Sequence, residues 1–118
     1  MEVMSGRLEG AHDGVEGGPL HIAQARAWWQ RLLGLMGRTR LPAGDCLAIA
    51  PCNAIHTFFM RMTIDVAFLD EQGRVLKTRY DLMPWRASLC LGAAMVLEFP
   101  AGGLDRFGVR EGSRLVWD

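Results

Sequence analysis

The sequence predicts an α+β fold: a single small domain in which a curled, mostly antiparallel or barrel-like β-sheet carries one main amphipathic helix. Half of the 118 residues are apolar, which is enough to bury one core but not two. Strand-like stretches outnumber helical ones and short turns join them, as in hairpins. We expect residues 1–18 to be a flexible tail and residues 19–118 to form the globular domain.

The N-terminal part predicts the tail, a short strand and the main helix. Residues 1–18 contain five glycines and scattered charges without apolar periodicity, so they cannot offset the entropy of becoming ordered. A short strand is expected over 20–23. From 24 to 36 apolar residues recur at helical spacing, which predicts an amphipathic helix that packs on the sheet and ends near Gly37.

The rest of the chain reads mainly as strands. A hairpin loop is expected over 70–73, where Gly73 suits a positive φ, and a single helical turn over 104–107. Six stretches have the apolar content or the alternation of strands. They are residues 46–50, 58–62, 64–69, 74–80, 94–99 and 113–117.

Asp65 is the one acid in a strand that is otherwise apolar. Ile64, Val66 and Phe68 would lie on one face of that strand and Ala67 on the other, so the strand is expected inside the sheet. Burying a carboxylate is costly unless it is hydrogen-bonded or paired. Asp65 is therefore our first candidate functional residue, and a structural partner would explain it equally well.

Other polar side chains are embedded among the apolar strands. Arg61 or Arg86 could hold Asp65 or Glu98 in an internal ion pair, because guanidinium binds carboxylate in a fork. We favour this pairing, although the same groups would suit a polar small ligand. Neighbouring Met and aromatic residues fit either the core or a pocket lining. The candidate ligand-binding residues are His56, Thr57, Arg61, Asp65, Trp85, Arg86 and Glu98.

The cysteines raise two further hypotheses. Cys52 and His56, four residues apart, could form the thiolate and imidazole of a cysteine hydrolase. Together with Cys46 and Cys90 they could in principle bind zinc, but structural zinc ligands are usually paired on tight turns and these are dispersed. We favour core packing, and we predict neither a metal nor a cofactor.

Composition limits the partners. Thirteen basic and thirteen acidic residues balance, so no positive field is available for nucleic acid. There is no signal-like start or membrane-spanning stretch, and an odd number of cysteines fits a reducing compartment, so we expect a cytoplasmic protein. We expect a small ligand or a protein partner. Trp28 and Leu35, beside the helix stripe, allow a monomer or a weak dimer.

Several motifs in fixed order give the chain a family resemblance. The motifs are Arg31-Leu32-Leu33-Gly34-Leu35-Met36-Gly37-Arg38, His56-Thr57-Phe58-Phe59-Met60-Arg61, Ile64-Asp65-Val66-Ala67-Phe68-Leu69-Asp70, Pro84-Trp85-Arg86, Val96-Leu97-Glu98 with Ala101-Gly102, and Gly108-Val109-x-x-Gly112. From Leu20 to Trp117 the chain resembles the family catalogued as domain of unknown function 192. The resemblance implies a compact β-rich fold with one main helix and no established activity.

The resemblance also implies two differences from relatives. Many members carry export signals or lipid anchors, which this sequence lacks. Phe59-Met60-Arg61-Met62-Thr63 stands where many relatives have Trp-Met-Lys-Asn-Thr, so a ligand contact through the Asn amide would be lost.

Our leading hypothesis is a non-enzymatic binding module for a small polar ligand or a protein partner, with its surface at His56, Arg61, Asp65, Trp85 and Arg86. The alternatives are the cysteine hydrolase and an accessory protein of a secretion or surface-assembly system, the latter suggested by the export of relatives.

Overall fold

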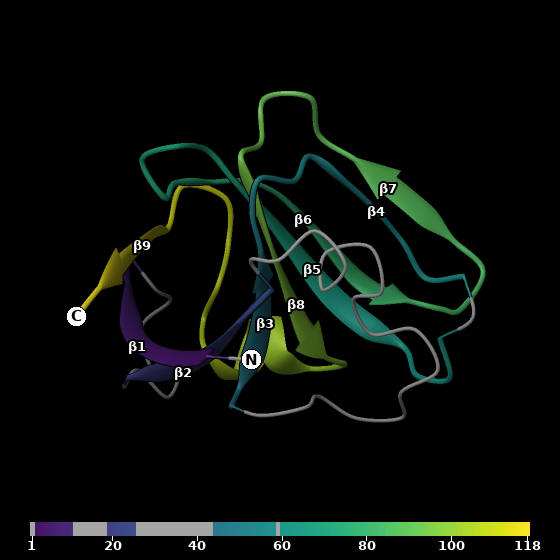
Figure 1. Cartoon of the computed structure of the whole chain (residues 1–118), viewed down its shortest axis with the longest axis horizontal. Helices are drawn as coiled ribbons and strands as arrows, with labels where there is room; N and C mark the ends of the chain where they lie inside the picture. Colours follow the sequence, from purple (N-terminus) through teal and green to yellow (C-terminus); the bar gives the residue numbers. More distant parts are fainter. Residues whose placement is uncertain (1, 11–18, 26–43, 59) are drawn as a thin grey trace.

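The computed structural model describes residues 2–10, 19–25, 44–58 and 60–118. In these ranges the chain forms a seven-stranded sheet, ordered β6-β5-β8-β3-β2-β1-β9, and a two-stranded ribbon of β4 and β7 (Figure 1). The elements are β1 (Glu2–Glu9), β2 (Leu20–Ala25), β3 (Cys46–Ile49), β4 (Ala54–His56), β5 (Ile64–Leu69), β6 (Val75–Leu82), β7 (Ala87–Leu89), β8 (Met95–Pro100), α2 (Gly103–Arg106) and β9 (Arg114–Trp117).

The large sheet curls into a half-barrel whose two edge strands touch. All its neighbouring strands are antiparallel except β2 and β3, which are parallel. At the edges, the backbone of Arg74, just before β6, forms an isolated antiparallel β-bridge with that of Arg114 in β9. The Leu115 N–H also donates to the Gly73 carbonyl at 2.8 Å. The predicted curled, mostly antiparallel sheet of a single small domain is confirmed.

The two faces of the sheet carry separate apolar cores. The inner core contains Ala67 and Leu69 of β5, whereas Ile64, Val66 and Phe68 of the same strand belong to the outer core. Because side chains alternate along a strand, β5 is buried on both faces, as its sequence predicts.

A short helix and the ribbon complete these cores. Leu104 of α2 and the following Phe107 belong to the inner core, and the Phe107 ring lies 6.1 Å from that of Phe99 at the end of β8. The α2 helix therefore closes the end of the half-barrel where β8 finishes. On the outer face Ile55 of β4 joins the outer core, and the Lys77 ammonium donates to the Leu89 carbonyl at 2.9 Å, which ties the ribbon to β6.

The N-terminal segment differs from the prediction. Residues 2–9 were expected in a flexible tail, but they form β1, which pairs with β2 on one side and β9 on the other. Main-chain hydrogen bonds to two neighbours stabilise this strand, so it needs little apolar alternation of its own. Gly6 permits the close approach, because a Cβ there would lie 3.0 Å from the Val116 carbonyl oxygen.

The helical content was overstated. Within the described ranges the only helix is α2, which has four residues, close to the single turn expected over 104–107. Of the helix predicted over 24–36, Gln24 and Ala25 belong to β2, and residues 26–36 lie outside the described residues, as do Trp28 and Leu35 of the suggested dimer surface.

One predicted strand was also wrong. Over 58–62 the described residues form a turn and irregular backbone, and the Met60 N–H donates to the Thr57 carbonyl at 3.2 Å instead of to a neighbouring strand. The other six predicted strands, including the short one over 20–23, are confirmed, with ends shifted by up to two residues.

Gly73 should be essential for contact between the two sheet edges. Its φ is +83°, and an added Cβ would lie 2.7 Å from the Leu115 carbonyl oxygen, whereas Gly112 has φ +90° and no atom within 4 Å of the added carbon. In both Ala variants the left-handed backbone conformation costs about 1–2 kcal/mol. We expect Gly73→Ala to lower the free energy of unfolding further than Gly112→Ala in urea titrations. Equal losses would show that the Leu115 contact is not tight.

Candidate functional site

Thr57 fastens the loop that carries Trp85. Its side chain is fully buried, and its hydroxyl donates to the Met83 carbonyl at 2.7 Å and accepts the Arg86 N–H at 2.8 Å. Its own N–H donates to the Arg86 carbonyl at 2.8 Å, and its carbonyl accepts the Trp85 N–H at 3.1 Å. Main chain and side chain of one residue thus fix the whole loop, and Thr57 acts as a positioning residue.

Three aromatic rings stand in a row above this anchor. Trp85 has φ +64°, a left-handed conformation that is rare for a bulky side chain, and its side chain is 57% exposed. Its ring stacks on Phe58 with 5.8 Å between centroids, and Phe58 lies 4.9 Å from the His56 ring. The Phe58 N–H also donates to His56 Nδ1 at 3.2 Å. We call His56, Phe58 and Trp85 the aromatic surface.

The aromatic surface continues along the ribbon. His56 and Leu89 are exposed, while Ile55 between Ala54 and His56 is buried, so alternation places the exposed side chains on the solvent face. Leu91, in the turn after β7, is also exposed. Sequence reasoning assigned Phe58 to a core or pocket cluster and missed Leu89, because three-residue strands are too short to show alternation.

The predicted internal ion pairs do not form. Arg61 and Arg86 are both exposed, whereas Asp65 and Glu98 are buried, and among the described residues no ion pair joins either arginine to either acid. A terminal nitrogen of Arg86 donates to the Trp85 carbonyl at 3.3 Å. In the part of the chain that the structure describes, the ion pairs are formed by Arg7 and His21 with other acids. Arg86, directly after Trp85, therefore presents charge beside the aromatic surface, and the exposed Arg61 lies three residues after Phe58 in the chain.

Asp65 is satisfied by backbone instead of arginine. Its Oδ1 accepts the Asp81 N–H at 2.9 Å, and its Oδ2 accepts the N–H groups of Gly102 and Leu104 at 3.1 and 3.2 Å. Asp81 lies in a β-bulge, where two residues of β6 oppose Asp65 alone. The Asp65 side chain is 1% exposed and so does not contribute to the aromatic surface.

Glu98 is buried without such partners. It pairs across the sheet with Leu47 and Val66, both in the outer core, and its Oε2 has no hydrogen-bond partner among the described residues. Burial in this apolar setting raises the pKa of Glu98 from 4.5 to about 8. Like Asp65, Glu98 lies apart from the aromatic surface.

The cysteine residues do not assemble with His56. Cys52 donates its S–H to the Ala54 carbonyl at 3.0 Å, while His56 Nδ1 accepts from the Phe58 backbone. Cys46 is buried in the inner core, and burial raises the pKa of its thiol well above the usual range. Among residues 2–10, 19–25, 44–58 and 60–118, no group of three or more His, Cys, Asp or Glu side chains is placed to hold a metal ion.

The fold and these motifs place the chain in a family. The family model described as DUF192, an uncharacterized ACR, matches residues 11–117. The chain belongs to the DUF192 family. A UPF0127 protein of Thermococcus sibiricus is 35% identical over 66 residues, covering 55% of this DUF192 chain and 42% of the relative. A UPF0127 protein of Pyrococcus furiosus is 33% identical over 95 residues, covering 75% and 79%. The chain thus spans less than half the length of the first relative.

Two solved structures share the DUF192 chain's fold. A Novosphingobium aromaticivorans protein of unknown function superposes with a TM-score of 0.81 at 20% identity, covering 98% of this chain and 85% of that one. A Sinorhizobium meliloti structure, provisionally described as a transcription regulator, gives 0.79 at 20% identity, covering 99% and 96%. At this identity the likeness concerns the fold alone. None of the described helices of the DUF192 chain is long and apolar enough to span a membrane.

Asp65→Asn should destabilise the fold. The amide keeps one acceptor oxygen and turns an N–H₂ group toward backbone donors, so at least one backbone N–H loses its acceptor, which costs about 1–3 kcal/mol. Urea titration measures the loss, and Asp105→Asn, at an exposed aspartate of α2, is the matched control. If the two variants unfold at the same urea concentration, the role assigned to Asp65 is wrong.

Glu98 should make stability fall as pH rises. Between its unfolded pKa of 4.5 and its native pKa of about 8, the unfolded chain is ionised while the native carboxyl keeps its proton. The free energy of unfolding then drops by at most about 1.4 kcal/mol per pH unit. In urea titrations we expect the free energy of unfolding of Glu98→Gln to rise relative to that of the original chain between about pH 5 and pH 8. The exposed control Glu111→Gln should show the same pH dependence as the original chain. Parallel curves of unfolding free energy against pH for the original chain and both variants would contradict this prediction.

Proposed function

We propose that the protein is a non-enzymatic binding module that holds an apolar segment of a protein partner on the aromatic surface. The observation that carries this proposal is Trp85, an exposed side chain in a strained backbone conformation that a buried Thr57 holds in place. Strain of this kind persists only where surrounding contacts enforce it, and it is concentrated at functional sites.

The character of the exposed residues supports a protein partner. Trp, Phe and Met are enriched where proteins bind one another, and a tryptophan often dominates the binding energy. Trp85 and Phe58 are stacked and anchored before any partner arrives, so less side-chain entropy is lost on binding. Leu89 and Leu91 extend the apolar area along the ribbon.

The charges nearby suggest the partner's chemistry. Arg86 follows Trp85 directly, and Arg61 lies in the segment whose Met60 N–H donates to the Thr57 carbonyl at 3.2 Å. Both arginines are exposed and form no ion pair among the described residues. We therefore expect acidic residues beside the partner's apolar segment, since complementary charge speeds and orients association.

The hydrolase alternative has less support. A thiolate nucleophile needs an adjacent base, and the Cys52 thiol and the His56 ring hydrogen-bond to different backbone groups. No other described contact favours it.

Trp85→Ala should weaken the partner complex at least about tenfold, as expected for a central interface tryptophan. A photoreactive phenylalanine analogue at Leu91, which is 81% exposed, would first crosslink and identify the partner in the native host. Calorimetry with both purified proteins then gives the affinity. Val3→Ala, at an exposed residue of β1, is the control and should change nothing.

Two variants of Thr57 test the anchoring separately from contact. Thr57→Val removes the hydroxyl that holds Met83 and Arg86 and should weaken binding, whereas Thr57→Ser keeps the hydroxyl and should restore it. Thermal unfolding establishes that each variant is folded. Full affinity in Trp85→Ala, or no crosslinked partner at Leu91, would overturn the proposal.

A further inference from the structure

Two arginines lie opposite each other where the edges of the half-barrel meet. Arg74 and Arg114 form the β-bridge there, and the hydrogen bonds on either side of it join neighbouring residues instead of the two arginines. These bonds run from the Leu115 N–H to the Gly73 carbonyl at 2.8 Å and from the Val75 N–H to the Ser113 carbonyl at 2.7 Å. In such a non-hydrogen-bonded pair the Cα atoms are about 4.5 Å apart, so the side chains lie close together.

Both arginine side chains leave the sheet on its solvent side. Val75 and Leu115, the residues that follow them, belong to the inner core, so alternation places Arg74 and Arg114 on the opposite face. Both arginines are exposed. We call Arg74 and Arg114 the arginine pair.

No contacting acid balances the charges of the arginine pair. Among the described residues neither guanidinium forms an ion pair. Glu9 of β1 lies opposite Arg114 in the register, but its carboxylate pairs with Arg7 at 3.9 Å. Like charges that lie directly opposite each other across a sheet destabilise it. A bound anion would therefore stabilise this arrangement.

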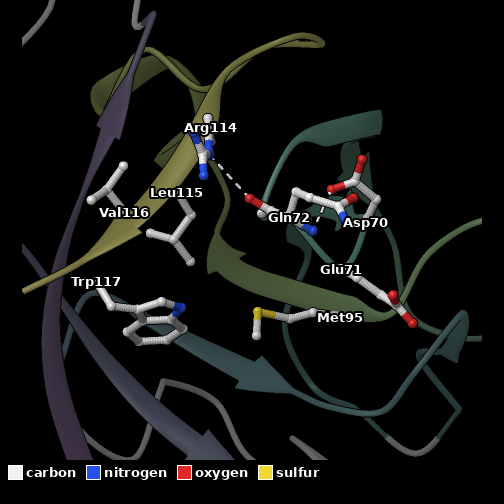
Figure 2. A pocket seen from close by; sticks show the side chains of 9 residues that line it. Asp70, Glu71, Gln72, Met95, Arg114, Leu115, Val116 and Trp117 are labelled. Atoms are coloured by element: carbon white, nitrogen blue, oxygen red, sulfur yellow. Dashed lines mark hydrogen bonds between the residues drawn. The ribbon is translucent and has the colours of Figure 1, made fainter.

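Hydrogen bonds hold Arg114 in place for such a role. Its Nε–H donates to the Gln72 carbonyl at 3.1 Å, as the dashed line between them in Figure 2 marks. The loop that carries this carbonyl is fixed by Asp70, whose Oδ1 accepts the N–H groups of Gln72 and Arg74, both at 2.9 Å. The terminal nitrogens of Arg114 form no hydrogen bond within the described ranges, so they can donate to a ligand while Nε keeps its partner.

We infer that the arginine pair binds a phosphate group, either free phosphate or that of a phosphate monoester. Two guanidinium groups offer several N–H donors to the oxygens of one phosphate, a geometry for which arginine is well suited. At neutral pH a monoester carries nearly two negative charges, which match both arginines, whereas a carboxylate carries one. The arginine pair shares no residue with the aromatic surface, and the inference does not depend on the proposed function.

Thermal unfolding of the full chain in phosphate and in chloride of equal ionic strength tests this inference. In about 20 mM inorganic phosphate we expect the unfolding temperature to rise by at least about 2 °C, because a ligand that binds only the native state stabilises it. Glycerol 3-phosphate is the monoester probe, and the larger of the two shifts tells which form fits better. Acetate should act like chloride. Equal unfolding temperatures in phosphate, acetate and chloride overturn the inference.

Two variants assign the shift to the arginine pair. Arg74→Gln and Arg114→Gln should each lose most of the phosphate shift. In chloride, Arg74→Gln should unfold no lower than the original chain, because it removes one of two opposed like charges. Arg79→Gln, at an exposed arginine further along β6, is the matched control and should keep the full shift.

The Arg74 variant decides even where Arg114→Gln does not fold, because the Arg74 side chain forms no hydrogen bond within the described ranges. A full phosphate shift in Arg74→Gln overturns the inference. An equal loss of the shift in Arg79→Gln does so too, since it would mean that phosphate acts on the general charge of the surface.

Discussion

The Asp65 carboxylate joins three segments that are distant in sequence, and the closed end of the half-barrel depends on it. It receives one backbone N–H from the bulge in β6 and two from the chain that enters α2. Hydrogen bonds to a charged group are stronger than neutral ones, about 1.5–3 kcal/mol each. The carboxylate thus links the bulge of β6 to the segment in which α2 begins.

Because α2 closes one end of the half-barrel, the candidate functional side chains lie on its other surfaces. The inner core ends at Leu104 and Phe107 on one side and opens toward Met95 and Trp117 on the other. The outer core is covered in part by the ribbon, whose opposite face carries His56, and the Phe58 and Trp85 rings follow in the adjoining loops. The aromatic surface therefore lies over the outer core, whereas the open end of the half-barrel borders the inner core.

The sequence predicted the features that depend on local patterns, such as the alternation of side chains along a strand. Alternation identified β5 as a strand buried on both faces, and of the candidate binding residues Thr57 contacts the backbone of Trp85 and Arg86. The acids were misjudged because a buried carboxylate can be satisfied by backbone N–H groups, which composition does not reveal. The stacking of Phe58 on Trp85 depends on a left-handed loop residue, and that conformation is imposed by tertiary contacts from Thr57.

Asp65 and Glu98 show that burial alone does not identify a functional acid. Both lie in apolar strands, yet Asp65 has three donors, whereas Oε2 of Glu98 has no partner among the described residues. Without hydrogen-bond donors, the neutral form of a buried carboxyl has the lower free energy. Burial therefore raises the pKa of Glu98 to about 8. Asp65 therefore has a structural explanation in its contacts, and Glu98 is tolerated because it keeps its proton.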